Sequence, residues 1–446
     1  MGKKKESQRD RRRRSKTARD NDDARVTRTR ATPTSIRDLS DDLLELVLLR
    51  TASPVSLVRA AAVCKPWRRV IAGGGGFLRR FRSLRGPHVL GHYHVESSGK
   101  IAFVPSPAPP RESAAAADDD DTDDDDTRGG GRASLDFLLH KLLPGPMSPA
   151  LTDSRGGLLL FVHMNYTIIV CEPWRKQYRE LDLPPRPPWM NGGYSVSECL
   201  GAFLLDADAG IPSFRVLYVR LHRTVGDPSH TVSAFVVSAS GGGGGGRWHL
   251  LSSKTIVAGD VAVVPMIFEY VGRAGGLLCW SVRGHGNGVP LLQLDERTGE
   301  FSSFVLPMAA AATSNPRTYT RQNLRVVGAD DAGVLRLCRV VGDDLEVLRC
   351  ARGGGGGGGG SCAVERRVAL SRLIGAWPGW RRWWFLDTAA ATPARLVLTS
   401  NAENNMMFIV DVETMELECA RERERHASRV FPYELPWPPT IEACTM

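Results

Sequence analysis

Short apolar runs separated by turn residues recur over the C-terminal two thirds of the chain. The run 275–280, for example, is followed by the runs 291–295 and 301–307, with the turn 296–299 between the last two. Apolar runs of this length, bounded by glycine and acidic residues, are typical of β-strands. The sequence therefore predicts a large all-β domain over residues 87–446.

The spacing of the repeated strands limits which all-β architectures this domain can adopt. The spacings between aligned strand ends are 53 to 67 residues, measured at Cys171, Ser238, Asp295, Leu348 and Asp411. Glycine runs at 241–246 and 353–360 account for part of the scatter. Units of several strands that repeat every 40–50 residues or so are typical of β-propellers. We expect a propeller-like domain, with a large β-sandwich as the alternative, and find no repeat short enough for a leucine-rich solenoid.

A different pattern occupies residues 39–81, where apolar residues recur at helical spacing. Ser40 can cap a first helix whose first turn holds two aspartates. Pro54 and Pro66 stand in the first turns of two further helices, and Gly73 is expected to end the third. A unit of about 45 residues is near the lower limit of independent stability. It therefore needs cover from the rest of the protein or from a partner.

The third predicted helix begins with the motif Val-Cys-Lys-Pro-Trp-Arg at residues 63–68. Other pattern residues precede and follow it: Leu39, Asp41, Leu44, Val47, Leu48, Leu57 and Phe77. Together they resemble the F-box, so that the chain is predicted to hold a three-helix F-box at residues 34–82 before its β-domain. The F-box has a proline where this chain has Ser40, a departure expected to weaken docking.

The resemblance implies that residues 34–82 dock a Skp-type adaptor and, through it, a cullin. The implied adaptor-binding residues are Leu39, Leu44, Val47, Leu48, Leu57, Val63, Cys64 and Trp67. Residues 136–139 and 153–160 also resemble the plant F-box-associated β-propeller, whose implied role is to bind a target protein. The sequence names neither the target nor the residues that bind it.

The function implied is that of a non-catalytic substrate-recognition subunit of a Skp-cullin-F-box-type E3 ubiquitin ligase. One alternative is a regulatory or scaffold protein that binds the adaptor without a cullin. Another is a nuclear, nucleic-acid-associated protein that uses its basic N-terminal arm. A further alternative is that residues 34–82 form a three-helix cap of a larger domain and bind no partner.

The net charge of +9 is concentrated in an N-terminal tail, because residues 1–30 hold 13 Lys and Arg against five Asp and Glu. The tail 1–33 is predicted to be disordered, as a solvated arm or a nuclear-import signal. No aromatic residue lies among its basic residues, so specific nucleic-acid binding is not expected. The inserts 106–132, 240–247 and 352–361 are also predicted to be disordered, and they match neither calcium-binding nor phosphate-binding loops.

No catalytic motif or complete metal site is visible, and we expect no enzyme activity and no cofactor. His92 and His94 share one face of a predicted strand but lack a third ligand. The nine cysteines include no CxxC pair, which predicts free thiols and a location in the nucleus, the cytoplasm or both. No apolar run is long enough to predict a membrane span. The cluster Trp377, Trp380, Trp383 and Trp384 is interpreted as core packing or as a substrate-facing surface.

Overall fold

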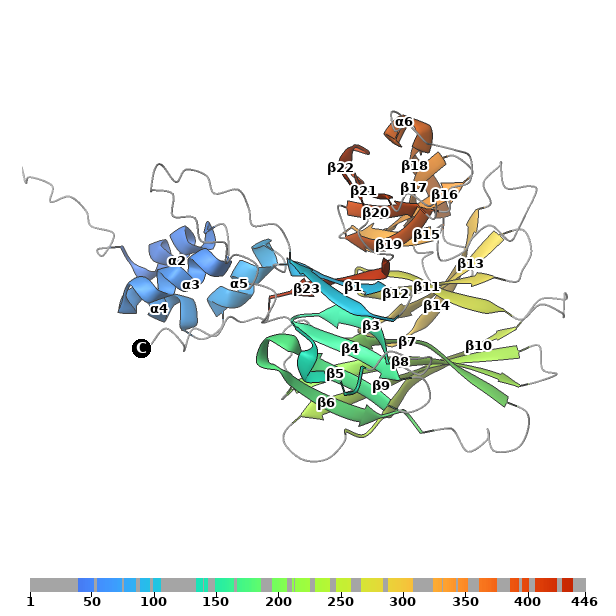
Figure 1. Cartoon of the computed structure of the whole chain (residues 1–446), viewed down its shortest axis with the longest axis horizontal. Helices are drawn as coiled ribbons and strands as arrows, with labels where there is room; N and C mark the ends of the chain where they lie inside the picture. The colour runs from blue at the N-terminus through green and yellow to red at the C-terminus, as the bar shows by residue number, and fades with distance from the viewer. Residues whose placement is uncertain are drawn as a thin grey trace, which may run out of the picture. The chain divides into compact units, whose positions relative to one another are not determined.

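The computed structural model describes residues 39–435, apart from short gaps and from the longer gaps 106–133, 143–148, 186–194, 258–265, 308–323, 352–360 and 375–385 (Figure 1). The chain divides into two compact units, residues 1–86 with 440–446 and residues 87–439. The basic tail, the aspartate-rich insert, the glycine runs 241–245 and 353–360 and the four-tryptophan cluster lie outside the described residues.

The described part of the first unit is helical. Its elements are α2 (Asp41–Leu49), α3 (Pro54–Val63), α4 (Lys65–Ala72) and α5 (Gly76–Arg85). Ser40 caps α2 as predicted, with its hydroxyl oxygen accepting a hydrogen bond from the Leu43 amide at 3.4 Å. The sequence predicted three helices, whereas the structure adds α5. The reason is that Phe77, Leu78 and Phe81 form an apolar helix face that the structure buries.

One apolar core joins these helices. Its buried side chains include Leu44, Leu48, Leu49, Leu57, Ala61, Ile71, Phe77, Leu78 and Phe81. Two ion pairs link other helices to α2: Arg69 lies 2.8 Å from Asp41, and Arg80 lies 2.6 Å from Glu45. Exposed pairs of this kind contribute little stability. Burial of the apolar side chains, at about 1.5–3 kcal/mol each, therefore holds the helical unit together.

The second unit consists of antiparallel sheets, five of four strands and a sixth of three in its described residues. The first sheet holds β3 (Ala150–Arg155), β4 (Leu158–His163), β5 (Thr167–Glu172) and β6 (Gln177–Asp182). The second holds β7 (Ser195–Leu204), β8 (Ser213–Thr224), β9 (Ser229–Ser240) and β10 (His249–Val257). The third holds β11 (Ile267–Ala274), β12 (Leu277–Arg283), β13 (Gly288–Asp295) and β14 (Phe301–Pro307).

The remaining sheets follow the same order along the chain. The fourth holds β15 (Leu324–Ala329), β16 (Leu335–Val341), β17 (Asp344–Ala351) and β18 (Ser361–Ala369). The fifth holds β19 (Leu386–Thr392), β20 (Arg395–Ser400), β21 (Met406–Asp411) and β22 (Leu417–Glu422). The sixth combines β23 (Ala427–Glu434) with β1 (Val89–Glu96) and β2 (Ile101–Pro105). Short helical turns are η2 (Asp136–Leu138), η3 (Pro173–Arg175) and α6 (Leu370–Ile374).

The sheets are arranged as the blades of a closed ring. The first strands of successive sheets contact one another, β3 with β7, β7 with β11, β11 with β15 and β15 with β19. Strand β19 then contacts β23, and β23 contacts β3, which completes the ring. This is the architecture of a β-propeller, in which each sheet presents its first strand toward the centre. The propeller prediction is confirmed, and the sandwich alternative is excluded.

Closure joins the two ends of the propeller sequence. Strand β23 pairs with β1, so that Phe431 lies opposite Tyr93, and Figure 1 shows the red strand β23 beside the blue strand β1. Residues 395–422 contribute strands β20 to β22 of the fifth sheet, and β23 follows them as the closing strand.

The spaces between neighbouring blades hold the core. Strand β4 shows why a continuous apolar run was visible in the sequence, since residues 158–162 are all buried. Leu158, Leu160 and Val162 pack toward the second blade, whereas Leu159 and Phe161 pack toward β1 and β23. A strand buried on both faces therefore has no polar face.

A β-bulge recurs where the first strand of a blade pairs with the second. The bulged residues are Thr152, Leu200, Val271 and Val327. Bulges increase local strand twist, which suits the twisted blades of a propeller. Gly272 follows one bulge at φ 137°, and a Cβ there would lie 3.0 Å from the Cβ of Val326. Glycine is needed here because two innermost strands approach closely.

Two turns repeat the pattern Asp-x-x-Thr-x-Glu. The Asp295 carboxylate accepts hydrogen bonds from two following backbone amides at 2.9 and 3.0 Å, and Asp411 accepts the same two bonds at 2.8 Å each. Gly299 and Met415 occupy equivalent left-handed positions, at φ 74° and 59°. The predicted alignment of Asp295 with Asp411 is therefore confirmed in atomic detail.

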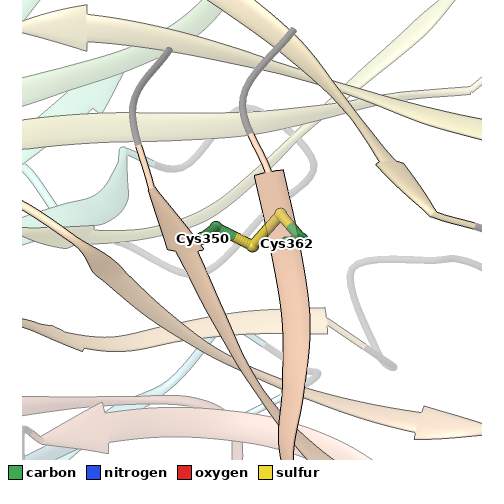
Figure 2. The surroundings of a disulfide bond; sticks show 2 residues. All are labelled: Cys350 and Cys362. Atoms are coloured by element: carbon green, nitrogen blue, oxygen red, sulfur yellow. A yellow bond between two sulfur atoms is a disulfide. The ribbon is translucent and has the colours of Figure 1, made fainter. Parts of the chain in front are cut away.

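A disulfide joins Cys350 in β17 to Cys362 in β18 (Figure 2). The two residues are direct partners in the strand ladder. The prediction of free thiols is therefore wrong for this pair, although Cys64, Cys171, Cys199, Cys279 and Cys338 are free. Their separation of 12 residues across a glycine run resembles no motif, and only the strand register brings them together.

Candidate functional site

Three apolar side chains lie exposed along one face of α2, and we call them the α2 stripe. Leu43, Leu46 and Val47 are 52%, 54% and 48% exposed. Their spacing of three and four residues places them on one side of the helix. The buried residues Leu44 and Leu48 occupy the other side. Exposed apolar surface concentrated on one helix face of a small unit marks a candidate docking site.

The residues that the F-box resemblance assigns to adaptor binding differ in their solvent exposure. Leu44, Leu48 and Leu57 are 3%, 2% and 0% exposed and belong to the core of the helical unit. Val47 and Val63 are exposed. Leu39, Cys64 and Trp67 are half-buried. The structure contains no adaptor, so adaptor binding by these residues stays a prediction, now centred on the exposed ones.

The buried positions have a physical explanation. Helix α2 is apolar almost all round, so its sequence does not decide which face turns inward. Helix α5, which the sequence analysis did not predict, contacts α2 and α4 and contributes Phe77 and Phe81 to the core. The face with Leu44 and Leu48 is thereby covered. Leu43 and Leu46 were missed as candidate binding residues, although their helical spacing from Val47 would have identified them.

A second cluster consists of charged side chains that link the first three blades. Arg273 forms ion pairs with Asp153, at 3.3 Å, and with Glu296. Arg155 lies 3.4 Å from Glu296. Both arginines donate hydrogen bonds to the Leu204 carbonyl, at 3.2 and 2.8 Å, and Asp153 accepts one from the Leu204 amide at 2.8 Å.

The electrostatics of this cluster are those of a mutually neutralising network. Burial raises the pKa of Asp153 and of Glu296, while the positive charge of Arg273 opposes both shifts. Two carboxylates face two guanidinium groups, so the charges balance within the protein. Its side chains come from β3, β11 and the turn after β13, and they meet at the backbone of Leu204 in β7. We interpret the cluster as a brace between blades.

The predicted histidine pair lies on β1. Tyr93, between His92 and His94, is 1% exposed and packs against Tyr433 with ring centroids 5.4 Å apart. Burial lowers the pKa of His92. Across the described ranges of the chain, no three His, Cys, Asp or Glu side chains are grouped so as to hold a metal ion. None of the described helices is long and apolar enough to cross a membrane.

No protein-family model and no curated protein matches the sequence. Among solved structures, the chain is similar to the Cps50 (Swd1) β-propeller domain of Myceliophteria thermophila, with a TM-score of 0.32, 14% identity and coverage of 62% of this chain and 74% of that chain. It is similar to Sqt1 of Saccharomyces cerevisiae, with a TM-score of 0.31, 11% identity and coverage of 64% and 66%. It is also similar to apo AztD of Citrobacter koseri, with a TM-score of 0.31, 10% identity and coverage of 65% and 76%.

Scores this low carry no argument about function, and the assignment of the fold rests on the strand pairing and the ring of contacts described above. On those grounds, the protein is a β-propeller preceded by a small helical unit.

Proposed function

We propose that this protein is a non-catalytic substrate receptor of a Skp-cullin-F-box-type ubiquitin ligase. The observation that carries the proposal is the α2 stripe, an exposed apolar helix face within the segment that resembles an F-box. The helical unit binds a Skp-type adaptor through this face, and the propeller binds the target protein. The receptor then accelerates ubiquitin transfer by proximity, because tethering raises the effective concentration of the target near the conjugating enzyme.

The apolar surface that docking can bury on the α2 stripe determines how much this face contributes to adaptor affinity. Complete burial of one leucine or valine side chain is worth about 1.5–3 kcal/mol. Leu43, Leu46 and Val47 are each about half exposed, so docking can bury roughly half of that value for each side chain. The stripe therefore contributes about 3 kcal/mol, which corresponds to an affinity change of ~100-fold.

The docking test compares two charge substitutions in the full chain. Leu46→Asp places a carboxylate in the α2 stripe, and Leu84→Asp is the matched control, because Leu84 is an exposed leucine of α5, 64% exposed against 54% for Leu46. We expect L46D to weaken binding to a purified Skp-type adaptor by ~100-fold or more in calorimetry, and L84D to bind as the unaltered chain does. Circular dichroism checks that both variants keep their helices.

Equal adaptor affinity for L46D and the unaltered chain would show that the α2 stripe is not the docking face. A separate measurement addresses the ligase itself. Cullin should co-purify with the full chain and be lost with L46D. Adaptor without cullin would instead favour the regulatory or scaffold function. Affinity purification with the proteasome inhibited then identifies the target protein.

A further inference from the structure

The disulfide lies at the outer edge of the fourth blade. The strand order of that blade is β15-β16-β17-β18, so Cys362 belongs to the outermost strand. Leu335, Cys350 and Cys362 form one row across β16, β17 and β18. Figure 2 shows the bond running directly between the two neighbouring strands. The covalent link therefore fastens the outermost strand near its first residues.

The two sulfur atoms stand in different surroundings. Cys350 is 3% exposed and belongs to an apolar cluster with Leu335 and Leu348. Cys362 is half-buried and packs at the border of that cluster. A small reagent can therefore approach the sulfur of Cys362, whereas that of Cys350 is shielded.

The opposite end of β18 is held by charge. Arg339, Glu346 and Arg367 form a row across β16, β17 and β18. The Glu346 carboxylate is 1% exposed, lies 2.7 Å from Arg339 and also forms an ion pair with Arg367. A buried carboxylate between two guanidinium groups is strongly held, because losing either partner leaves an uncompensated buried charge.

The middle of β18 connects the fourth blade to the fifth. Glu365 forms an ion pair with Arg336 at 3.2 Å, and Arg336 also pairs with Glu413 in the turn after β21. Arg366 donates a hydrogen bond to the Glu413 carbonyl. The position of β18 therefore determines polar contacts between the two blades.

We propose that Cys350 and Cys362 form a reversible thiol–disulfide site, with small thiols and dithiols as its reactants, that fastens the first residues of β18. A dithiol reductant attacks the sulfur of Cys362 as a thiolate. The bond between the two protein sulfurs breaks, and Cys350 leaves as a thiolate that takes up a proton. The second thiol of the reductant then displaces the Cys362 thiolate, so two electrons pass to the protein and the reductant becomes a cyclic disulfide.

The two ends of β18 respond differently to this exchange. After reduction, residues 361–363 keep only their backbone ladder and side-chain packing. Residues 366–369 keep the charged row at Glu346 as well. Reduction therefore frees the first end of the strand and leaves the second end in place. A change confined to the first residues of β18 therefore distinguishes local loosening of this strand end from general unfolding of the blade.

The test is hydrogen exchange with mass spectrometry on the full chain, first oxidised with glutathione disulfide and then treated with dithiothreitol without denaturant. Peptide mapping should find the Cys350–Cys362 link in the oxidised protein and none after reduction. We expect amide exchange at residues 361–363 to become at least tenfold faster on reduction, with little change at 366–369. The double variant C350S/C362S should exchange as the reduced protein does and ignore dithiothreitol.

Several results would overturn the proposal. These are the absence of the link after oxidation, a link that is reduced only in denaturant, or equal exchange at 361–363 in both redox states. A dithiothreitol response that persists in C350S/C362S would assign the effect to other cysteines. Where the double variant fails to fold, the single variant C362S serves instead, since the disulfide is lost and the shielded Cys350 is retained. After native reduction, Cys362 should react with iodoacetamide before Cys350, and the reverse order would contradict the mechanism.

Discussion

Closure of the propeller by β23 makes Tyr433 the most informative residue to truncate. Tyr433 is fully buried, with its ring centroid 5.4 Å from that of Tyr93 in β1 and 6.1 Å from that of Phe103 in β2. It also packs with the residues of the first blade, among them Leu159 and Phe161. Tyr433→Ala therefore removes contacts to both neighbours of the closing strand.

The structure sets the size of the expected effect. Replacing a fully buried aromatic side chain by alanine costs about 3–5 kcal/mol through lost burial and the cavity left behind. Two edge-to-face ring contacts add about 0.5–1.5 kcal/mol each. We expect Y433A to lower the free energy of unfolding of the propeller by about 4–8 kcal/mol, a large share of the stability of a typical domain.

The assay is urea unfolding of the full chain, followed through tryptophan fluorescence, because the buried Trp280 reports on the propeller. Tyr178→Ala is the matched control, since Tyr178 in β6 is 37% exposed. It should cost less than ~1.5 kcal/mol. Equal losses for Y433A and Y178A, or a loss below ~1 kcal/mol for Y433A, would refute the view that β23 closes the ring. Adaptor binding by the helical unit should be unchanged in both variants.

Two further predictions concern buried charge. Burial, with the nearby Arg220 charge, lowers the pKa of His222 to about 4, so folding favours the neutral imidazole. Above pH ~6.5 the imidazole is neutral in both the folded and the unfolded protein, whereas between pH ~6.5 and 4 only the unfolded protein gains the proton, so the free energy of unfolding falls as the pH falls. In urea unfolding at a series of pH values, His222→Gln should reduce this fall by about 1–3 kcal/mol. An equal fall in the variant and the unaltered chain would contradict the prediction. Arg273→Met leaves Asp153 and Glu296 without their shared partner and should cost about 3–5 kcal/mol at pH 7. Because burial raises both carboxyl pKa values, the loss should shrink as the pH is lowered and the carboxyls become protonated; a loss independent of pH would argue against the brace.

Local patterns in the sequence predicted the elements that neighbouring residues determine. Strands β16 and β17 follow one another along the chain and pair directly, with Leu337 opposite Leu348. The Asp295 and Asp411 turns were also placed correctly, because the aspartate side chain itself closes the turn. In each case the deciding interactions lie within about ten residues.

Other features depend on contacts that no local pattern contains. Helix α2 is apolar on several faces, so the burial of Leu48 and the exposure of Leu46 were decided by α5 and the other helices. The pairing of β1 with β23 and the disulfide follow from strand register across long or glycine-rich connections. For the candidate site, the sequence pointed to helix α2 but did not show which of its faces is exposed.

The pairing of β23 with β1 also constrains how the protein is made. A ribosome releases β1 early, yet the strand that pairs with it to close the ring is synthesised only after the first five blades. Helices α2 to α5 precede all of these strands, and their buried side chains form a core of their own. Until β23 arrives, one edge of β1 and one face of the first blade stay uncovered. This interval is when the nascent chain is most exposed to mispairing, and chaperone demand should therefore be greatest late in synthesis.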